Sequence, residues 1–254
     1  MFNCELHVTG KNNRIKHMKK LLILLTFLLI AQASNAQLFS KERIKNNENI
    51  DKQRISWGFY FGFNSYDYQF NYKEDLKDIL VETTTGFNVG LVSNLRINEY
   101  LDLRFEPGLY ITQRNLQYDP SYFNGIEFND SDLLREVKAT YIHFPLLLKV
   151  STKRLNNFKP FVVAGLSTAL NLSSNEENPD DNNAGQFRSK KNMLFYELGF
   201  GVDFYLMWFK FTPSIRGVFA LNDEIVRDFD ANSPWTGNVQ TMKTRGVFVN
   251  FTFQ

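Results

Sequence analysis

Apolar and polar residues alternate with a period of two from about Ile55 to Gln254. Successive side chains of a β-strand point to opposite faces, so this pattern predicts strands with one apolar and one polar face. The clearest segment is 101–114, where Leu, Phe and Ile at odd positions are separated by polar residues such as Asp102, Arg104 and Glu106.

The alternation divides the chain into about eight predicted strands. Seven are defined by the pattern itself: 57–64, 87–96, 101–114, 141–150, 194–204, 209–219 and 245–254. The segment 161–172 is small and apolar on both faces, and its position in the series is what predicts a strand there.

Short and long connections follow one another between these strands. The short ones lie near Asn98, at 153–157 and near Leu206, and the long polar ones at 73–83, 117–136, 173–190 and 222–241. Strict alternation of short turns and long loops is typical of bacterial outer-membrane barrels, whose short turns are periplasmic. We therefore predict an all-β, transmembrane, antiparallel up-and-down β-barrel spanning 55–254, with both of its ends in the periplasm.

A secreted β-sandwich or lipocalin-like barrel also alternates and needs no membrane. Its apolar face would point inward. Aromatic residues make up 15% of this chain, with 25 Phe and 11 Tyr. The interior of an eight-stranded barrel is narrow, whereas outward aromatic side chains fit the girdles of a membrane barrel. The composition favours the membrane alternative.

The N-terminal region has the pattern of an export signal. Lys19 and Lys20 precede an apolar run from Leu21 to Ala31, and small residues follow before Gln37. The run is shorter than the roughly 20 residues of a spanning helix, so we predict a cleaved signal peptide at 1–36, with translation starting at Met18 as one interpretation of the preceding residues. Residues 37–54 are polar and predict a flexible periplasmic leader.

Removal of 1–36 would change the charge and the cysteine content. The full chain carries +2, but the predicted mature part has 24 basic and 26 acidic residues, a net charge near −2. No nucleic-acid partner is expected from such a balance. Cys4 lies in the removed part, so neither a disulfide nor a thiolate metal site is expected.

Charged residues occur on the face opposite the apolar one. In a closed barrel they would point into the lumen, where acids and bases can form an ion-pair network; a conduction path or a ligand site is the alternative. The predicted lumen residues are Arg96, Arg104, Glu106, Arg114, Lys149, Glu197, Asp203, Lys210 and Arg216.

His143 is the histidine that remains after processing, and it is predicted to be a polar filler of the inward face. A lipid hydrolase using His143 with Ser167 or Ser214 is the catalytic alternative, but no nucleophile motif accompanies these residues. We expect no catalytic, cofactor or metal site, since zinc sites use several His or Cys ligands.

The predicted loop 117–136 is more apolar than a solvated loop needs, with Tyr118, Tyr122, Phe123, Ile126 and Phe128. An exposed apolar loop is a candidate docking surface for another protein.

Several segments resemble outer-membrane barrels of the PorT family of Bacteroidetes. They include Leu101-Asp-Leu-Arg-Phe-Glu-Pro-Gly-Leu109, His143-Phe-Pro-Leu-Leu-Leu-Lys149 and the final Gly246-Val-Phe-Val-Asn-Phe-Thr-Phe-Gln254. The first two motifs recur in many barrels of that wider group and identify the architecture better than the role. The resemblance extends from about Arg54 to the end.

This resemblance implies an outer-membrane component of the type IX protein secretion system, with other secretion components as partners. The family supplies no catalytic residues. The alternatives are a stand-alone adhesin or ligand receptor acting through the long loops, and the hydrolase named above.

Overall fold

The computed structural model describes residues 45–74, 76–178 and 187–254. The chain divides into two units, 1–44 and 45–254, and the second forms the fold. The predicted signal peptide and residues 37–44 of the predicted leader therefore lie outside the described residues. No helix in the described ranges is long and apolar enough to cross a membrane.

The described residues of this unit form ten antiparallel strands and three short 3-10 helices. The strands are β1 (Ile55–Tyr72), β2 (Leu80–Thr83), β3 (Thr85–Arg96), β4 (Leu101–Phe105), β5 (Gly108–Gln117), β6 (Leu134–Ser151), β7 (Phe158–Asn171), β8 (Asn192–Tyr205), β9 (Lys210–Ala220) and β10 (Val239–Phe253). The helices are η1 (Ile50–Lys52), η2 (Pro120–Phe123) and η3 (Asp130–Asp132).

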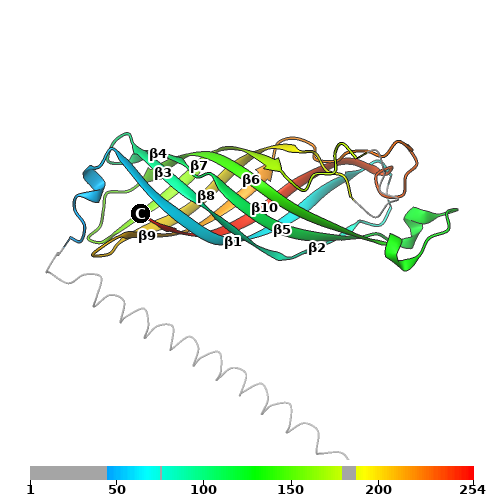
Figure 1. Cartoon of the computed structure of the whole chain (residues 1–254), viewed down its shortest axis with the longest axis horizontal. Coiled ribbons are helices and arrows are strands. Elements are labelled where there is room, and N and C mark those ends of the chain that lie inside the picture. The colour runs from blue at the N-terminus through cyan, green and yellow to red at the C-terminus, as the bar shows by residue number, and fades with distance from the viewer. Residues whose placement is uncertain (1–44, 75, 179–186) are drawn as a thin grey trace, which may run out of the picture. The chain divides into compact units, whose positions relative to one another are not determined.

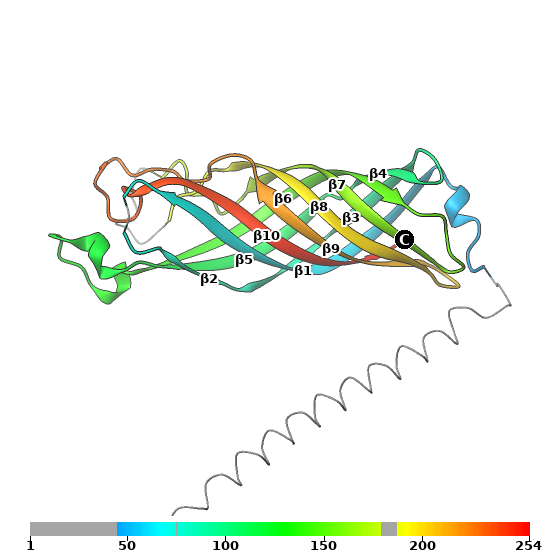
Figure 2. The same cartoon turned by 180° about the vertical axis from the view of Figure 1, so that it is seen from behind.

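The strands close into a ring. From β6 to β10 each strand pairs with the next one in the sequence, β4 and β5 both pair with β3 and with β6, and β1 pairs with β10 on one side and with β3 on the other. Figures 1 and 2 show the resulting barrel from opposite sides, with all strands tilted in the same sense. The predicted antiparallel up-and-down fold is confirmed, and closure removes the free edges that an open sheet would leave exposed.

The ten strands fill eight positions around the barrel, because two positions are each occupied by two consecutive strands. These are β2 with β3 and β4 with β5. Glu106 and Pro107 separate β4 from β5, and the register across the gap is kept, because Phe105 faces Leu146 and Gly108 faces His143. Proline has no N–H to donate to a ladder, so one donor is missing there, although Glu106 N–H still donates to the Pro145 carbonyl (3.2 Å) and the Pro107 carbonyl still accepts from Leu91 (2.9 Å). Thr84 separates β2 from β3, and the register against β5 shifts there by one residue, because Thr83 faces Arg114 and Phe87 faces Ile111.

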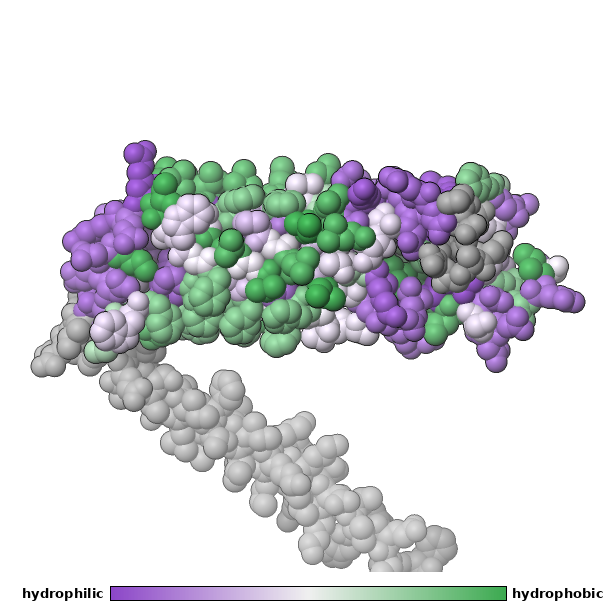
Figure 3. Space-filling model, viewed as in Figure 1, coloured by the Kyte–Doolittle hydropathy of each residue, from purple (hydrophilic) through white to green (hydrophobic). Residues whose placement is uncertain are grey.

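The outward face of the barrel is apolar. Trp57, Leu166, Leu198 and Phe200 are each at least 60% exposed, whereas the charged residues of the opposite face are buried. Figure 3 shows the apolar residues as a band between two polar ends. A soluble sandwich or lipocalin-like barrel would have the reverse arrangement, so the burial pattern excludes it.

The height of the apolar band matches a membrane. On β8 the outward apolar positions run from Leu194 to Phe204; at about 3.3 Å per residue and a tilt of about 40°, this corresponds to roughly 25 Å. Beyond the band the outward residues turn polar, as with Asp67 and Arg245, which form an ion pair of 2.6 Å across β1 and β10.

Strands β1, β6 and β10 are longer than the hydrophobic pattern predicted. Their extra residues lie beyond the apolar band, where buried apolar residues such as Tyr68, Val137 and Met242 lie on the inward face instead. The ladder continues there, but the outward apolar positions stop because that side no longer faces lipid. The predicted connection 73–83 is shortened for a related reason, since β2 pairs with β5.

The two ends of the barrel differ. The terminal end carries the short turns 97–100, 152–157 and 206–209 together with η1 and Gln254, and the loop end carries the long connections. Part of the predicted leader is folded against the terminal end: Asn46 Nδ2 donates to the carbonyl of Tyr205 (3.2 Å), and Arg154 Nη1 lies 3.3 Å from Asp51 Oδ2.

Candidate functional site

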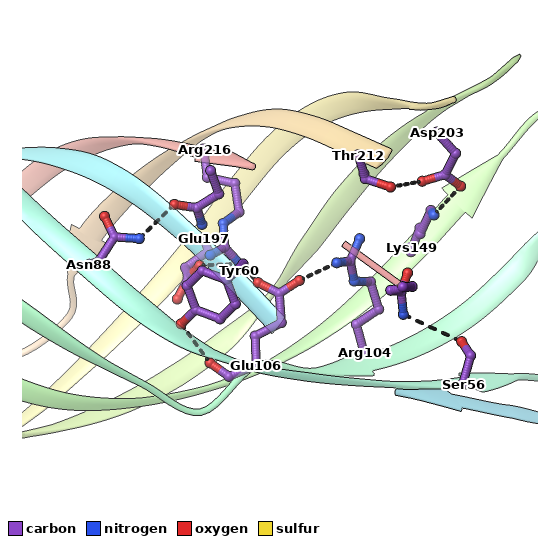
Figure 4. A network of polar contacts seen from close by, with 12 residues as sticks. Ser56, Tyr60, Asn88, Arg104, Glu106, Lys149, Glu197, Asp203, Thr212 and Arg216 are labelled. Atoms are coloured by element: carbon purple, nitrogen blue, oxygen red, sulfur yellow. Dashed lines mark hydrogen bonds and ion pairs between the residues drawn. The ribbon is translucent and has the colours of Figure 1, made fainter. Parts of the chain in front are cut away.

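The centre of the lumen holds an ion-pair chain of alternating sign. Glu106 lies between two guanidinium groups, with Oε1 2.6 Å from Arg104 Nη2 and Oε2 2.8 Å from Arg216 Nη1. Arg216 Nη1 is also 3.3 Å from Glu197 Oε2. All four side chains are at least 94% buried. Figure 4 shows them converging from β4, β8 and β9 and the β4–β5 break. Removing charges from water is tolerable because each carboxylate is matched.

A second pair lies nearer the terminal end. Lys149 Nζ on β6 donates to Asp203 Oδ2 on β8 at 2.5 Å, and the Thr212 hydroxyl donates to the other oxygen of Asp203 at 2.8 Å. The ammonium of Lys149 also lies 4.1 Å from the ring centroid of Phe161. Lys210, the first residue of β9, is buried at the same end.

Arg114 belongs to a third cluster, toward the loop end. Its guanidinium donates to the hydroxyls of Tyr141 (2.8 Å) and Thr244 (3.0 Å), and its Cζ lies 3.9 Å from the ring centroid of Tyr68. Both hydroxyls donate onward to the carboxylate of Glu224. Glu224 is fully buried although it follows β9 in a segment that was predicted to be a long polar connection. No signal in the sequence distinguishes it from Asp223, which is partly exposed.

The structure thus brings eight of the nine predicted lumen residues inside the barrel, in three clusters. Arg96 does not join them. It is the last residue of β3, is partly exposed, and donates to the carbonyl of Asn98 at the rim (3.3 Å). The alternation along β3 places Arg96 on the inward face, but the lumen ends before this position. The prediction that Arg96 is a lumen residue is therefore wrong.

Large aromatic side chains fill the lumen between the charged clusters. Tyr60 is an example: its hydroxyl lies 3.1 Å from the hydroxyl of Tyr110 and donates to the carbonyl of Glu106 at 3.2 Å. The ring fits because Gly108 has no side chain; a Cβ there would lie 2.0 Å from the Tyr60 hydroxyl. The buried rings of this cluster are Tyr60, Tyr66, Tyr110, Tyr141, Phe195 and Phe248.

His143 lies within this aromatic cluster and is fully buried. Its ring centroid is 5.1 Å from that of Tyr110 and 5.4 Å from that of Phe195, and Nε2 is 3.7 Å from Glu197 Oε1. Among the described residues, no hydrogen bond joins His143 to a serine hydroxyl. The proposed partner Ser167 is buried on the neighbouring β7 strand.

The loop end is closed by a second apolar cluster. Phe123 of η2 packs edge-to-face on Trp235 with centroids 5.6 Å apart, and Tyr118 donates to the carbonyl of Trp235 at 3.1 Å. Burial raises the pKa of the Tyr118 hydroxyl above its ordinary value. The apolar content of loop 117–136 is therefore used largely inside the protein, and of its five predicted apolar residues only Ile126 (50% exposed) and Phe128 (39% exposed) are exposed.

Asp119 connects this loop to the connection between β1 and β2. Lys77 Nζ donates to Oδ2 at 2.6 Å, and the backbone N–H of Ser121 donates to Oδ1 at 3.0 Å. These two bonds, the one from Lys77 first, lower the pKa of the Asp119 carboxyl from 3.8 to about 2. The carboxylate also caps η2, because its acceptor satisfies a free N–H at the helix start.

In the described ranges, no group of three or more His, Cys, Asp or Glu side chains is arranged to hold a metal ion. Of the buried lumen carboxylates, Glu106, Glu197 and Asp203 are instead paired with arginine or lysine.

Comparison with known proteins places this architecture in a family. A search of curated protein sequences gives no match. Among solved structures, similarity is found to Neisserial surface protein A (12% identity, 79% of this chain and 98% of that one, TM-score 0.40) and to the outer membrane protein OprG of Pseudomonas aeruginosa (15%, 78% and 93%, 0.42). The attachment invasion locus protein Ail of Yersinia pestis is also similar (11%, 79% and 99%, 0.37).

The family assignment rests on a sequence model rather than on these distant likenesses. The model of the outer membrane protein beta-barrel domain matches residues 31–226, well over half of the chain. The chain therefore belongs to the outer membrane protein beta-barrel domain family, and its apolar band lies in the lipid bilayer of the outer membrane.

Proposed function

We propose that this barrel is a non-enzymatic component of the type IX protein secretion system, needed for the export or assembly of secreted and surface proteins and, in gliding organisms, for motility. The motif resemblance to the PorT family suggests the system. Two of the motifs, 101–109 and 143–149, lie on adjacent strands of the barrel wall and supply Glu106 and Lys149 to the lumen clusters.

The filled lumen carries the structural part of the proposal. Ion pairs, aromatic rings and the loop cluster occupy it in succession, and Arg114, Arg216, Tyr110 and Phe248 are each at most 2% exposed. Eight-stranded barrels are narrow enough for side chains to fill. A filled lumen leaves no path for cargo through the barrel. This supports a structural or assembly role in which partners bind the outer surface or the two ends.

A gene-deletion strain tests the proposal. Export of cargo with C-terminal sorting domains should be lost, and should return when the gene is supplied on a plasmid. The control is the level of unrelated outer-membrane barrels, which should not change. Normal cargo export in the deletion strain would refute the proposal.

A stand-alone adhesin or ligand receptor is the second candidate, favoured by the exposed Ile126 and Phe128 at the loop end. This function predicts that deletion leaves export of sorting-domain cargo intact and removes binding of whole cells to a surface or ligand. The same strain therefore separates the two functions.

The orientation in the membrane is part of the proposal: we place the terminal end in the periplasm. The predicted mature protein contains no cysteine, so single substitutions can be labelled without background. Asn124→Cys in the β5–β6 loop should react with an impermeant maleimide on intact cells, and Lys153→Cys in the β6–β7 turn should react after the outer membrane is opened. The opposite pattern would reverse the assignment.

A further inference from the structure

The terminal end carries a concave basic surface. It is formed by η1 and the turns that follow β3 and β6, and encloses about 390 Å³. Six of its nine lining residues are basic and three are acidic: Lys45, Lys52, Arg96, Lys153, Arg154 and Lys159 against Glu48, Asp51 and Glu99. Such an excess within one concavity attracts anions.

Much of this positive charge is not neutralised. Arg154 is paired with Asp51 (3.3 Å) and lies over the ring of Tyr205 (3.8 Å from Cζ to the centroid). Arg96 and Lys159 donate to backbone carbonyls, and Lys52 donates to the Asn49 side-chain oxygen. Among the described residues these three cations form no ion pair, so their charge remains available to a ligand.

A second concavity on the other side of Arg96 connects this charge to the membrane band. It encloses about 630 Å³ and is lined by Lys52, Arg54 and Arg96 together with Leu95, Ile97, Asn98 and Glu99. Leu95 and Ile97 are 37% and 57% exposed, and Leu95 is paired with the exposed Ile55 of β1. Basic side chains thus begin at the point where the outward apolar residues of β1 and β3 end.

The opposite border of the band is different. There, two of the three cations next to the band are matched by carboxylates, because Arg245 is paired with Asp67 (2.6 Å) and Lys138 with Glu136 (3.0 Å). Lys243 has no ion pair among the described residues, so this border offers one unpaired cation where the terminal border offers Lys52, Arg54 and Arg96 together.

We propose that Lys52, Arg54 and Arg96 bind the phosphate headgroup of an anionic glycerophospholipid in the leaflet that touches the terminal end. The acyl chains would lie against Leu95 and Ile97, and the phosphate would accept bonds from the guanidinium and ammonium groups. Arginine presents a fork of donors that matches phosphate. An acidic peptide would use the charge but not the adjoining apolar surface, and this is why a lipid is favoured.

The test uses the full mature barrel reconstituted in phosphatidylcholine vesicles with spin-labelled phosphatidylglycerol or spin-labelled phosphatidylcholine as probes. The wild type should immobilise the phosphatidylglycerol probe at least about fivefold more strongly, the factor that corresponds to one engaged basic side chain near an anionic headgroup. The variant Lys52→Gln/Arg54→Gln/Arg96→Gln should lose this preference. Heat-modified migration on gels would verify that the variant is folded.

The matched control removes three cations at the other border, Lys138→Gln/Lys243→Gln/Arg245→Gln, and should keep the preference. Three results would overturn the proposal. The first is equal immobilisation of both probes by the wild type. The second is an equal loss in the control, which would indicate general surface charge. The third is displacement of the phosphatidylglycerol probe by millimolar inorganic phosphate or by an acidic peptide, which would assign the surface to a free anion or to a protein.

Discussion

Glu106 and Arg216 meet across the full diameter of the barrel. Glu106 lies in the wall formed by β4 and β5, Arg216 lies on β9 at the opposite position of the eight-membered ring, and their side-chain atoms approach to 2.8 Å. Both residues are also bonded to a second partner, Arg104 and Glu197 respectively. The pair therefore connects opposite walls, and it is the ion pair from which we expect the largest mutational effect.

Replacing Glu106 with Gln should destabilise the barrel by about 3–5 kcal/mol, because Arg104 and Arg216 would be left buried without their shared carboxylate. Urea unfolding in lipid vesicles would measure the loss. As a control, Asp67→Asn breaks the exposed pair with Arg245 and should cost no more than about 1 kcal/mol, since solvent screens that pair. Equal effects of the two substitutions would show that the lumen pair has no special role.

Gly108→Ala should destabilise the barrel by about 1–3 kcal/mol, because the added methyl would overlap the Tyr60 hydroxyl. Tyr60→Phe in the same chain should recover part of the loss by removing that oxygen. The matched control is Gly90→Ala. Its Cβ would meet the carbonyl oxygen of Pro107 at 2.4 Å as well as the Tyr60 hydroxyl at 2.6 Å, so Tyr60→Phe should not rescue it. Identical behaviour of the two alanine variants would contradict this account.

The docking of loop 117–136 should weaken in acid through Asp119. The folded-state pKa of about 2 lies below the usual 3.8, so the stabilisation is present above pH 4 and is lost as pH falls from about 4 to about 2. Trp235, which contacts Phe123 of η2, would report the change by its fluorescence. In Asp119→Asn, which keeps the helix cap, this transition should be absent; an unchanged transition would assign it to another group.

The exposed tip of the same loop should matter for partners and not for stability. Ile126→Ser should change the free energy of unfolding by less than about 1 kcal/mol, because this side chain is 50% exposed in the native barrel. Phe128 is left unchanged, because its ring packs 5.1 Å from that of the buried Phe123. If the tip docks another protein, cargo export or surface binding should fall. Phe123→Ala is the contrasting variant, since it opens the buried cluster and should destabilise the loop.

The order and number of the barrel walls could be predicted from the sequence because each depends on local periodicity. A strand that separates lipid from a packed lumen must alternate, so Phe200 and Arg104 reveal their faces by parity alone. Even the weak segment 161–172 was placed correctly as β7, since an up-and-down barrel needs a strand between the short turn and the long loop.

Parity alone does not reveal where a strand ends relative to the lumen or the membrane. Arg96 shares its parity with the lumen residues and still lies at the rim, and β1, β6 and β10 extend beyond the lipid-facing band, where no outward apolar face marks them. These positions depend on strand tilt and on the closure of the ring, which are properties of the assembled sheet.

The sequence by itself determined which face of the sheet the residues in the lipid-spanning part of each strand occupy, and only the tertiary structure decided which side chains meet. Glu106 and Arg216 come together because ring closure places β9 opposite β4 and β5. Glu224 and Phe123 become buried because their loops fold back over the barrel mouth. Periodicity records a one-dimensional alternation of environments, whereas these contacts require the circumference, the tilt and the folded loops together.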